Sequence, residues 1–204
     1  MNYDPNNIII LDDILPKWLH DQSVLNIPHI PVKFGHRGLG AYQGNQFFSD
    51  QWTNSELENA PWQLKAVWHA VEHHKSLISD DIGDIQLNQI QVNITTREHV
   101  GGLHVDSGPD VPAYTMVYFI TGDTGMDFWD NTPEEGGKVF DEVEYKEGRC
   151  VVFPSHYLHR GLPIQDVSPR VTAGFVFSGR SSQFSQQRNI IMPIFKSEQQ
   201  RFMQ

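Results

Sequence analysis

A run of eight short strand-like segments between residues 85 and 178 constrains the fold more than any other feature of the chain. β-Branched and aromatic residues recur in these segments, in part with the alternation of period 2 that is typical of a strand. Turn-forming residues separate them, including Gly101-Gly102, Ser107-Gly108-Pro109 and Ser168-Pro169. The segments span approximately residues 85–95, 100–106, 113–120, 126–130, 138–145, 149–154, 157–161 and 170–178.

Eight antiparallel strands of this length predict a jelly roll, in which two sheets face each other across a core. The expected fold class is therefore mainly β: a double-stranded β-helix (jelly roll, cupin-like) core with flanking N-terminal helices. With 204 residues, the chain is expected to form a single domain over residues 1–204. We expect residues 1–84 to be an N-terminal helical and loop flank, residues 85–178 the core, and residues 179–204 a C-terminal tail.

Two helices are expected in the N-terminal flank. A strand over Ile8 to Leu11 should lead into a short helix, capped by Asp12 or Asp13, with Ile14, Leu15, Trp18 and Leu19 on its apolar face. The stronger helix should run from Pro61 to about Leu77, because apolar residues recur on one of its faces. The proline- and glycine-rich stretch from Ile27 to Gln51 is expected to form loops.

Composition narrows the possible partners and the kind of site. The net charge of −10 argues against a broad positive surface for duplex nucleic acid, so a nucleic-acid partner is not expected. There is no apolar run of about 20 residues and no basic N-terminal leader, so we expect a cytoplasmic protein without a membrane segment. Cys150 is the single cysteine, so any metal should be held by nitrogen and oxygen ligands. The oligomeric state stays open.

Two histidines and one aspartate have the spacing of a metal site. In a strand, residues i and i+2 project from the same face, so His104 and Asp106 should converge, with Val105 turned away. His159 lies on the seventh segment, which can be a neighbour of the second segment in one sheet. Two imidazoles and one carboxylate can hold a non-haem iron(II) by one face and leave the other positions open. His156 is the rival third ligand, but it lies at a turn-like position.

Arg170 and Thr172 should face the same way at the start of the eighth segment. A planar guanidinium binds a carboxylate through two parallel hydrogen bonds, and a threonine hydroxyl beside it can supply another. The pair therefore fits the far carboxylate of a dicarboxylic keto acid whose other end chelates the metal.

Taken together, these motifs resemble those of the iron(II)/2-oxoglutarate-dependent dioxygenase superfamily, and within it the prolyl-4-hydroxylase-like branch. The resemblance covers about residues 85–178. It rests on the segments His104-Val105-Asp106, Tyr114-Thr115-Met116-Val117-Tyr118-Phe119, Gly125-Met126-Asp127-Phe128-Trp129-Asp130, Gly148-Arg149-Cys150-Val151-Val152-Phe153-Pro154-Ser155, His159-Arg160-Gly161 and Arg170-Val171-Thr172.

The resemblance implies roles for particular residues. His104, Asp106 and His159 would bind Fe(II), and Arg170 with Thr172 would bind 2-oxoglutarate as co-substrate, with O2 as the oxidant. A tyrosine on the third strand often joins the carboxylate pocket in such enzymes. Here Tyr118 and Phe119 straddle that position, and Tyr118 is the residue assigned to it.

The implied activity is hydroxylation of an unactivated C–H bond in a peptide (prolyl peptides included), an amino acid or a small metabolite. Substrate selection would then lie in flanking loops, for which the Gly35 to Gly44 segment and residues 107–113 are candidates. The alternative is a non-catalytic cupin-like metal-binding or sensor domain, which would have no need of Arg170 with Thr172. A third reading is a zinc peptidase, because His69, Glu72 and His73 match H-x-x-E-H. It is disfavoured because both histidines are expected to face solvent.

Overall fold

The computed structural model describes residues 3–37, 44–78, 84–98, 101–166, 168–179 and 189–191. The α-helices are α1 (Lys17–Asn26) and α2 (Trp62–His73), and short 3-10 turns occur at Pro5–Asn7, Ile27–His29, Asn54–Asn59, Lys75–Leu77 and Pro133–Glu135. The strands are β1 (Ile9–Asp12), β2 (Val32–Arg37), β3 (Gly44–Ser49), β4 (Gln86–Thr95), β5 (Ala113–Thr121), β6 (Met126–Trp129), β7 (Val139–Val143), β8 (Cys150–Pro154), β9 (Leu158–Gly161), β10 (Arg170–Ser178) and β11 (Asn189–Ile191).

These strands form two sheets. The main sheet has the order β11-β1-β8-β5-β10-β4-β3-β2, and the smaller sheet has the order β7-β6-β9. All pairings are antiparallel except that of β1 with β11. Side chains from both sheets line one cavity, so the sheets face each other as in a jelly roll. The predicted mainly β fold is confirmed.

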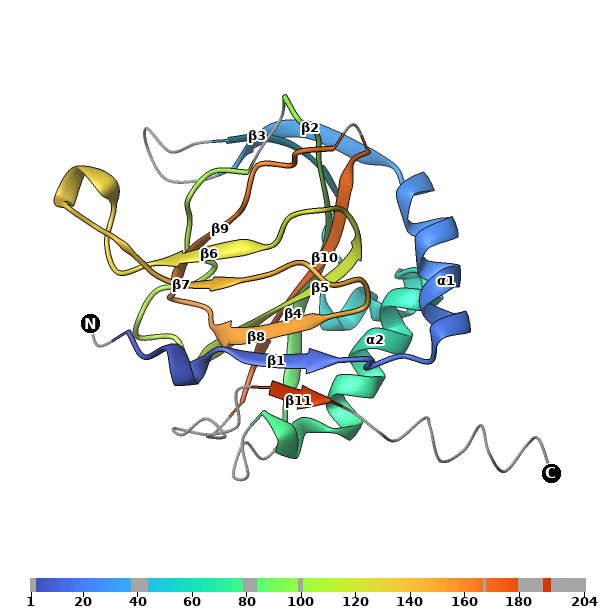
Figure 1. Ribbon diagram of the computed structural model, residues 1–204. Helices are drawn as coiled ribbons and strands as arrows, with labels where there is room; N and C mark the ends of the chain where they lie inside the picture. Colours follow the sequence, from blue (N-terminus) through green and yellow to red (C-terminus); the bar gives the residue numbers. More distant parts are fainter. Residues whose placement is uncertain are drawn as a thin grey trace.

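The two faces of the main sheet are covered differently. Against one face lie α1 and α2, side by side, as Figure 1 shows. The predicted apolar face of α2 is buried there, over Leu64, Val67, Trp68 and Val71. A second, mainly aromatic core fills part of the space between the two sheets, around Phe128 and Phe153. None of the described helices is long and apolar enough to cross a bilayer.

Strands that lie between these two cores are apolar on both faces. In β8, Cys150 and Val152 pack toward the helices, whereas Val151 and Phe153 pack toward the smaller sheet. A strand buried on both faces needs an uninterrupted apolar run, and this is why the sequence does not alternate there. Cys150 is fully buried, as expected of a small apolar side chain.

Seven of the eight expected core segments are strands, and the exception is residues 100–106. Its described part contains only one isolated bridge, between His104 and His159, so the prediction of a strand there is wrong. His104 adds a single paired residue to the open edge of β9. The glycines at positions 101 and 102 leave little side chain to stabilise a regular strand.

Three expectations for the N-terminal part are corrected. The Ile27 to Gln51 stretch is not all loop, because β2 and β3 form a hairpin that extends the main sheet next to β4. β1 also joins this sheet. The first helix begins at Lys17 without a side-chain cap, because Asp12 ends β1 and binds Arg149 and Lys146 instead. Trp18, expected on the apolar face, is exposed. Residues 38–43 lie outside the described residues.

Candidate metal centre and its cavity

His104, Asp106 and His159 converge at one end of the space between the sheets. One ligand atom from each lies within 4.8 Å of the others, and this is the one such group of potential metal ligands in the described part of the chain. The Nε2 atoms of His104 and His159 are each 3.6 Å from a carboxylate oxygen of Asp106. The backbones of the two histidines pair directly, through hydrogen bonds of 3.0 and 2.9 Å. The structure therefore brings together the three predicted ligands.

Backbone carbonyls orient both imidazole rings. Nδ1 of His104 lies 2.8 Å from the Gly102 carbonyl oxygen, and Nδ1 of His159 lies 2.9 Å from that of Tyr157. A carbonyl only accepts, so each Nδ1 carries the proton and each Nε2 presents its lone pair to the centre. Burial, and then the proximity of His104, lower the pKa of His159 to about 4. That imidazole is therefore neutral at pH 7, as a metal ligand must be.

Asp106 is positioned by a residue that the sequence analysis missed. Thr115 on β5 donates a hydrogen bond of 2.7 Å from Oγ1 to Oδ2 of Asp106, and its hydroxyl also lies 2.9 Å from that of Ser155. The Ser155 carbonyl accepts from the backbone N–H of Asp106. The available sequence signal for Thr115 was a hydroxyl residue set among apolar and aromatic residues in the first part of β5.

The donor set suits a divalent first-row metal. Two imidazole nitrogens and a carboxylate oxygen on one side of a cavity match the facial arrangement of non-haem iron(II) sites, with oriented second-sphere contacts. The cavity beside the cluster has a volume of about 530 Å³ and is lined from both sheets. Val105, between the two ligands, also lines the cavity.

Arg170 lies in the same cavity as the cluster. Its Nη1 donates to the backbone carbonyls of Gly125 (2.9 Å) and Leu162 (2.8 Å). The residue is only 5% exposed, yet no carboxylate among the described residues forms an ion pair with it. Burial lowers the pKa of Arg170 to about 10, opposed by the charge of Asp123, so the guanidinium is still a cation at neutral pH. Burying a cation without an anionic partner is energetically unfavourable, so an anionic ligand would stabilise Arg170.

Two glycines make room for this guanidinium. A Cβ on Gly161 would lie 1.8 Å from Nη2 of Arg170, and a Cβ on Gly122 would lie 2.7 Å from its Cγ. Gly122 also has a φ of +145°, which disfavours any other residue. The glycine of the His159-Arg160-Gly161 motif is therefore required sterically, because a larger residue would overlap the Arg170 guanidinium.

Two threonines lie beside Arg170 on the main sheet, which forms the floor of the cavity. Thr172 lines the cavity, as expected from its alternation with Arg170. Thr95 on β4 pairs directly with Arg170 across the strands, and such partners project from the same face. The Thr95 hydroxyl is buried and has no hydrogen-bond partner. Sequence reasoning missed Thr95, although it ends the alternating polar positions of β4.

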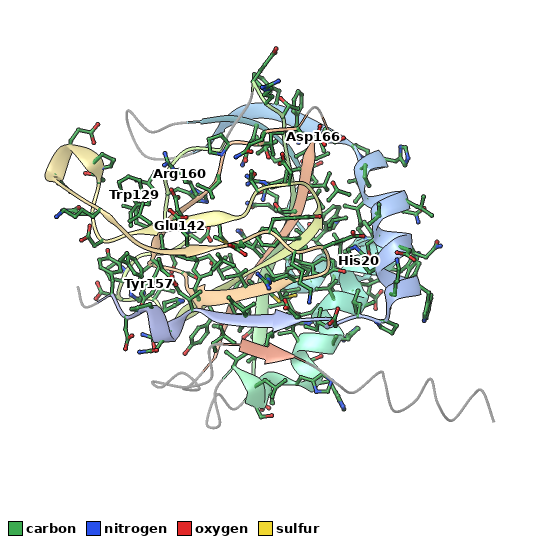
Figure 2. The ribbon with its side chains drawn as sticks, in the orientation of Figure 1. His20, Trp129, Glu142, Tyr157, Arg160 and Asp166 are labelled. Carbon is green, nitrogen blue, oxygen red and sulfur yellow. The ribbon has the colours of Figure 1, made fainter. Side chains whose placement is uncertain are left out.

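The assignment of Tyr118 to this cavity is corrected. Tyr118 is fully buried on the opposite face of β5, in the core beneath the helices. Its hydroxyl lies 2.5 Å from Nδ1 of His20 on α1, and Nε2 of His20 lies 2.9 Å from Glu147. Figure 2 shows His20 between α1 and the sheet. Phe119 lines the cavity instead.

Other residues considered from the sequence lie away from the cluster. His156 is in a turn and belongs to no ligand group in the described residues. His69 and His73 are exposed on α2, as expected, and His69 contacts Glu72 at 3.3 Å. Trp129 lies under Arg160, whose guanidinium carbon is 5.2 Å from its ring centroid, on the side of the molecule away from α1 (Figure 2). None of residues 107–113 lines the cavity.

Comparison with known proteins supports the fold. No protein-family model matches the sequence, and no curated protein is significantly similar to it. An oxidoreductase of the 2OG-Fe(II) oxygenase family from Burkholderia pseudomallei superposes with a TM-score of 0.58 at 13% identity, over 84% of this chain and 85% of that one.

Two further solved structures are similar. A prolyl hydroxylase from Trichoplax adhaerens, in complex with a hypoxia-inducible-factor peptide, has a TM-score of 0.56 and 16% identity, over 85% of this chain and 84% of that one. The alpha-ketoglutarate-dependent epimerase SnoN from nogalamycin biosynthesis has a TM-score of 0.58 and 11% identity, over 84% and 77%. At these identities the likeness establishes the architecture, and the chain therefore has the jelly-roll fold of the 2OG-Fe(II) oxygenases.

Proposed function

We propose that the protein is an iron(II)- and 2-oxoglutarate-dependent dioxygenase that hydroxylates an unactivated C–H bond of its substrate. One observation carries the proposal. The buried cation of Arg170, which has no carboxylate partner in the described residues, shares a cavity with a complete two-histidine, one-carboxylate cluster. A metal-binding domain without turnover would need the cluster but not the buried cation, so this pairing disfavours the non-catalytic alternative.

Each residue has a defined role in this proposal. His104, Asp106 and His159 hold the metal by one face, and Thr115 holds the Asp106 carboxylate in place. Arg170 binds the far carboxylate of 2-oxoglutarate through the N–H groups that do not contact Gly125 and Leu162. The hydroxyls of Thr95 and Thr172 line the same part of the floor.

Activation of dioxygen, with 2-oxoglutarate oxidised to succinate and carbon dioxide, is the chemistry that bound iron(II) supplies. The protein arranges and shields the reactants. The carbonyl-bound Nδ1 atoms prevent the histidines from rotating, and Phe119, Val117 and Met126 make part of the cavity wall apolar. The burial of Arg170 strengthens the attraction between its guanidinium and a carboxylate.

The proposal is tested by the visible spectrum of the anaerobic complex. Wild-type protein with iron(II) and 2-oxoglutarate should develop a weak charge-transfer band and should form succinate in air. His104→Ala should abolish the band, because one ligand of the chelate site is lost. Arg170→Ala should weaken it by raising the Kd of 2-oxoglutarate at least about tenfold, as expected when a hydrogen-bonded charge pair loses one partner. The control variant His156→Ala should keep the band.

A second pair of variants tests the binding of 2-oxoglutarate with Arg170 left in place. Gly161→Ala should weaken binding because the new Cβ overlaps Nη2 of Arg170. Gly174→Ala is the matched control on the cavity floor, since its Cβ would meet no atom nearer than 3.7 Å. No band and no succinate with the wild type would refute the proposed function.

A further inference from the structure

One wall of the cavity is made of carboxamide side chains. Gln89, Gln91 and Asn93 occupy successive cavity-facing positions on β4, and Gln46 and Gln51 join them from β3 and the residues after it. We call these five residues the amide wall. The residues between them on β4, such as Ile90 and Val92, face the helices and are buried. The polar positions of β4 therefore line a cavity.

The amide wall is partly fixed by its own hydrogen bonds. Gln46 donates from Nε2 to Oδ1 of Asn93 over 3.3 Å, and Gln91 donates from Nε2 to the Ser49 carbonyl over 3.0 Å. Gln46 and Gln91 are also more than nine-tenths buried. Their amide groups are thus oriented before any ligand arrives, which reduces the entropy lost on binding.

The wall carries no formal charge. Among the cavity-lining residues of the described chain, Asp106 and Arg170 are the only acidic and basic side chains apart from the two ligand histidines. In the proposed function Asp106 is taken by the metal and Arg170 by the co-substrate. The described lining residues then offer no further counter-charge for an ammonium or carboxylate group of the substrate.

We propose that the amide wall is the recognition surface for the prime substrate, and that the part of the substrate held there is uncharged and rich in hydrogen-bonding groups. The inference rests on the proposed function and specifies its substrate class. Carboxamides offer both donors and acceptors, so they match hydroxyl or amide groups. Side chains at i and i+2 of a strand repeat about every 6.8 Å, so the wall contacts a ligand at several points. A free amino acid would bring two charges that find no counter-charge on the amide wall, which disfavours its binding there.

Paramagnetic NMR can test this with matched probes. Protein loaded with Mn(II) and 2-oxoglutarate broadens the proton signals of molecules that bind near the metal, with Zn(II)-loaded protein as the diamagnetic reference. One probe set is methyl glucoside, glucosamine and glucuronate. The other is N-acetylprolinamide, prolinamide and N-acetylproline. Each set has a neutral, a cationic and an anionic member, and the two sets distinguish hydroxyl from amide recognition.

In at least one set, we expect the paramagnetic relaxation of the neutral member's protons to be at least about fivefold greater than that of the charged members. Only the neutral member binds without burying an unpaired charge. Gln89→Glu should shift the preference toward the cationic member. Asn88→Asp, at an exposed position of the same strand, should leave it unchanged.

Equal relaxation of charged and neutral members, no relaxation of either neutral member, or an unchanged preference in Gln89→Glu would each overturn the inference. Binding of 2-oxoglutarate is read in the same samples from its own relaxation. If the Mn(II)-loaded protein does not relax the protons of 2-oxoglutarate, the proposed function itself is wrong. If it relaxes 2-oxoglutarate but the probes behave as above, only the inference about the substrate is wrong.

Discussion

Thr95 is the residue at which the structure adds most to the sequence-based site. Its hydroxyl and the Trp129 indole N–H are the two buried side-chain groups without a hydrogen-bond partner in the described residues. A buried unsatisfied hydroxyl destabilises a protein by about 1–3 kcal/mol, and in the proposed function 2-oxoglutarate supplies the missing partner. The position of Thr95 opposite Arg170 places that ligand at the cation.

Thr95→Val should therefore separate folding from binding. The unliganded variant should melt at the same temperature as the wild type or higher, because the unsatisfied hydroxyl is gone. Its Kd for 2-oxoglutarate should rise about tenfold, the loss expected for one hydrogen bond to a charged group. Thermal unfolding and calorimetric titration of the Mn(II)-loaded protein measure both. Thr121→Val is the control, because its hydroxyl bonds to the Pro169 carbonyl at an exposed position. Lower stability with unchanged affinity would contradict the role of Thr95.

His104, Asp106 and Arg170 were predictable from the sequence because short-range spacing encodes them, whereas His159 is far from His104 in the sequence and was predictable from the motif His159-Arg160-Gly161. His104 and Asp106 are two positions apart, and Arg170 alternates with Thr172. Thr95 and Thr115 were not predictable in the same way. Thr95 meets Arg170 only through the register between β4 and β10, and Thr115 meets Asp106 only through the tertiary path of the loop before β5.

At the scale of elements, the two faces of β5 have different functions. Thr115, Val117 and Phe119 face the cavity, whereas Tyr114, Met116 and Tyr118 pack beneath the helices. Alternation divides these residues into two groups, but it does not state which group meets the smaller sheet. For this reason the tyrosine of the strand was assigned to the wrong face.

Tyr118→Phe tests this corrected placement. Loss of the hydroxyl leaves Nδ1 of buried His20 without its partner, which should cost about 1–3 kcal/mol of unfolding free energy. The melting temperature should fall by about 2–4 °C per kcal/mol for a chain of this size. The Kd of 2-oxoglutarate should stay within about twofold of the wild-type value. Tyr145→Phe is the comparison variant at a partly buried tyrosine. Weaker binding of 2-oxoglutarate without loss of stability would restore Tyr118 to the cavity.

At the scale of the whole molecule, two apolar cores hold the fold together, one beneath the helices and the other between the sheets. Of the three candidate ligands, His159 packs against the second core, at Phe128 and Phe153. The ligands come from the loop before β5 and from β9, so a bound metal and 2-oxoglutarate would join the smaller sheet to the main sheet through Arg170 on β10.

Removal of the metal should therefore leave the protein folded. With a chelator, the far-ultraviolet circular dichroism spectrum should stay unchanged. The melting temperature of this metal-free protein should be lower than that of the protein with Mn(II) and 2-oxoglutarate. Adding Mn(II) and 2-oxoglutarate at about 100 times their Kd should stabilise the protein by about 2.7 kcal/mol per ligand and raise the melting temperature by several degrees. His104→Ala should lose this increase. Unfolding by the chelator alone would mean that the metal is structural.

The sequence by itself determined seven strand segments of the core and named His104, Asp106, His159 and Arg170 as candidate site residues. The strands, the His104–Asp106 pair and Arg170 with Thr172 depend on residue type and on separations of a few positions, which can be read from the sequence directly. Only the tertiary structure decided that β1, β2 and β3 extend the main sheet, that Tyr118 faces the helices, and that the amide wall lines the cavity. The physical reason is that alternation defines two faces of a strand, whereas strand pairing and layer packing, which are long-range, decide what each face meets.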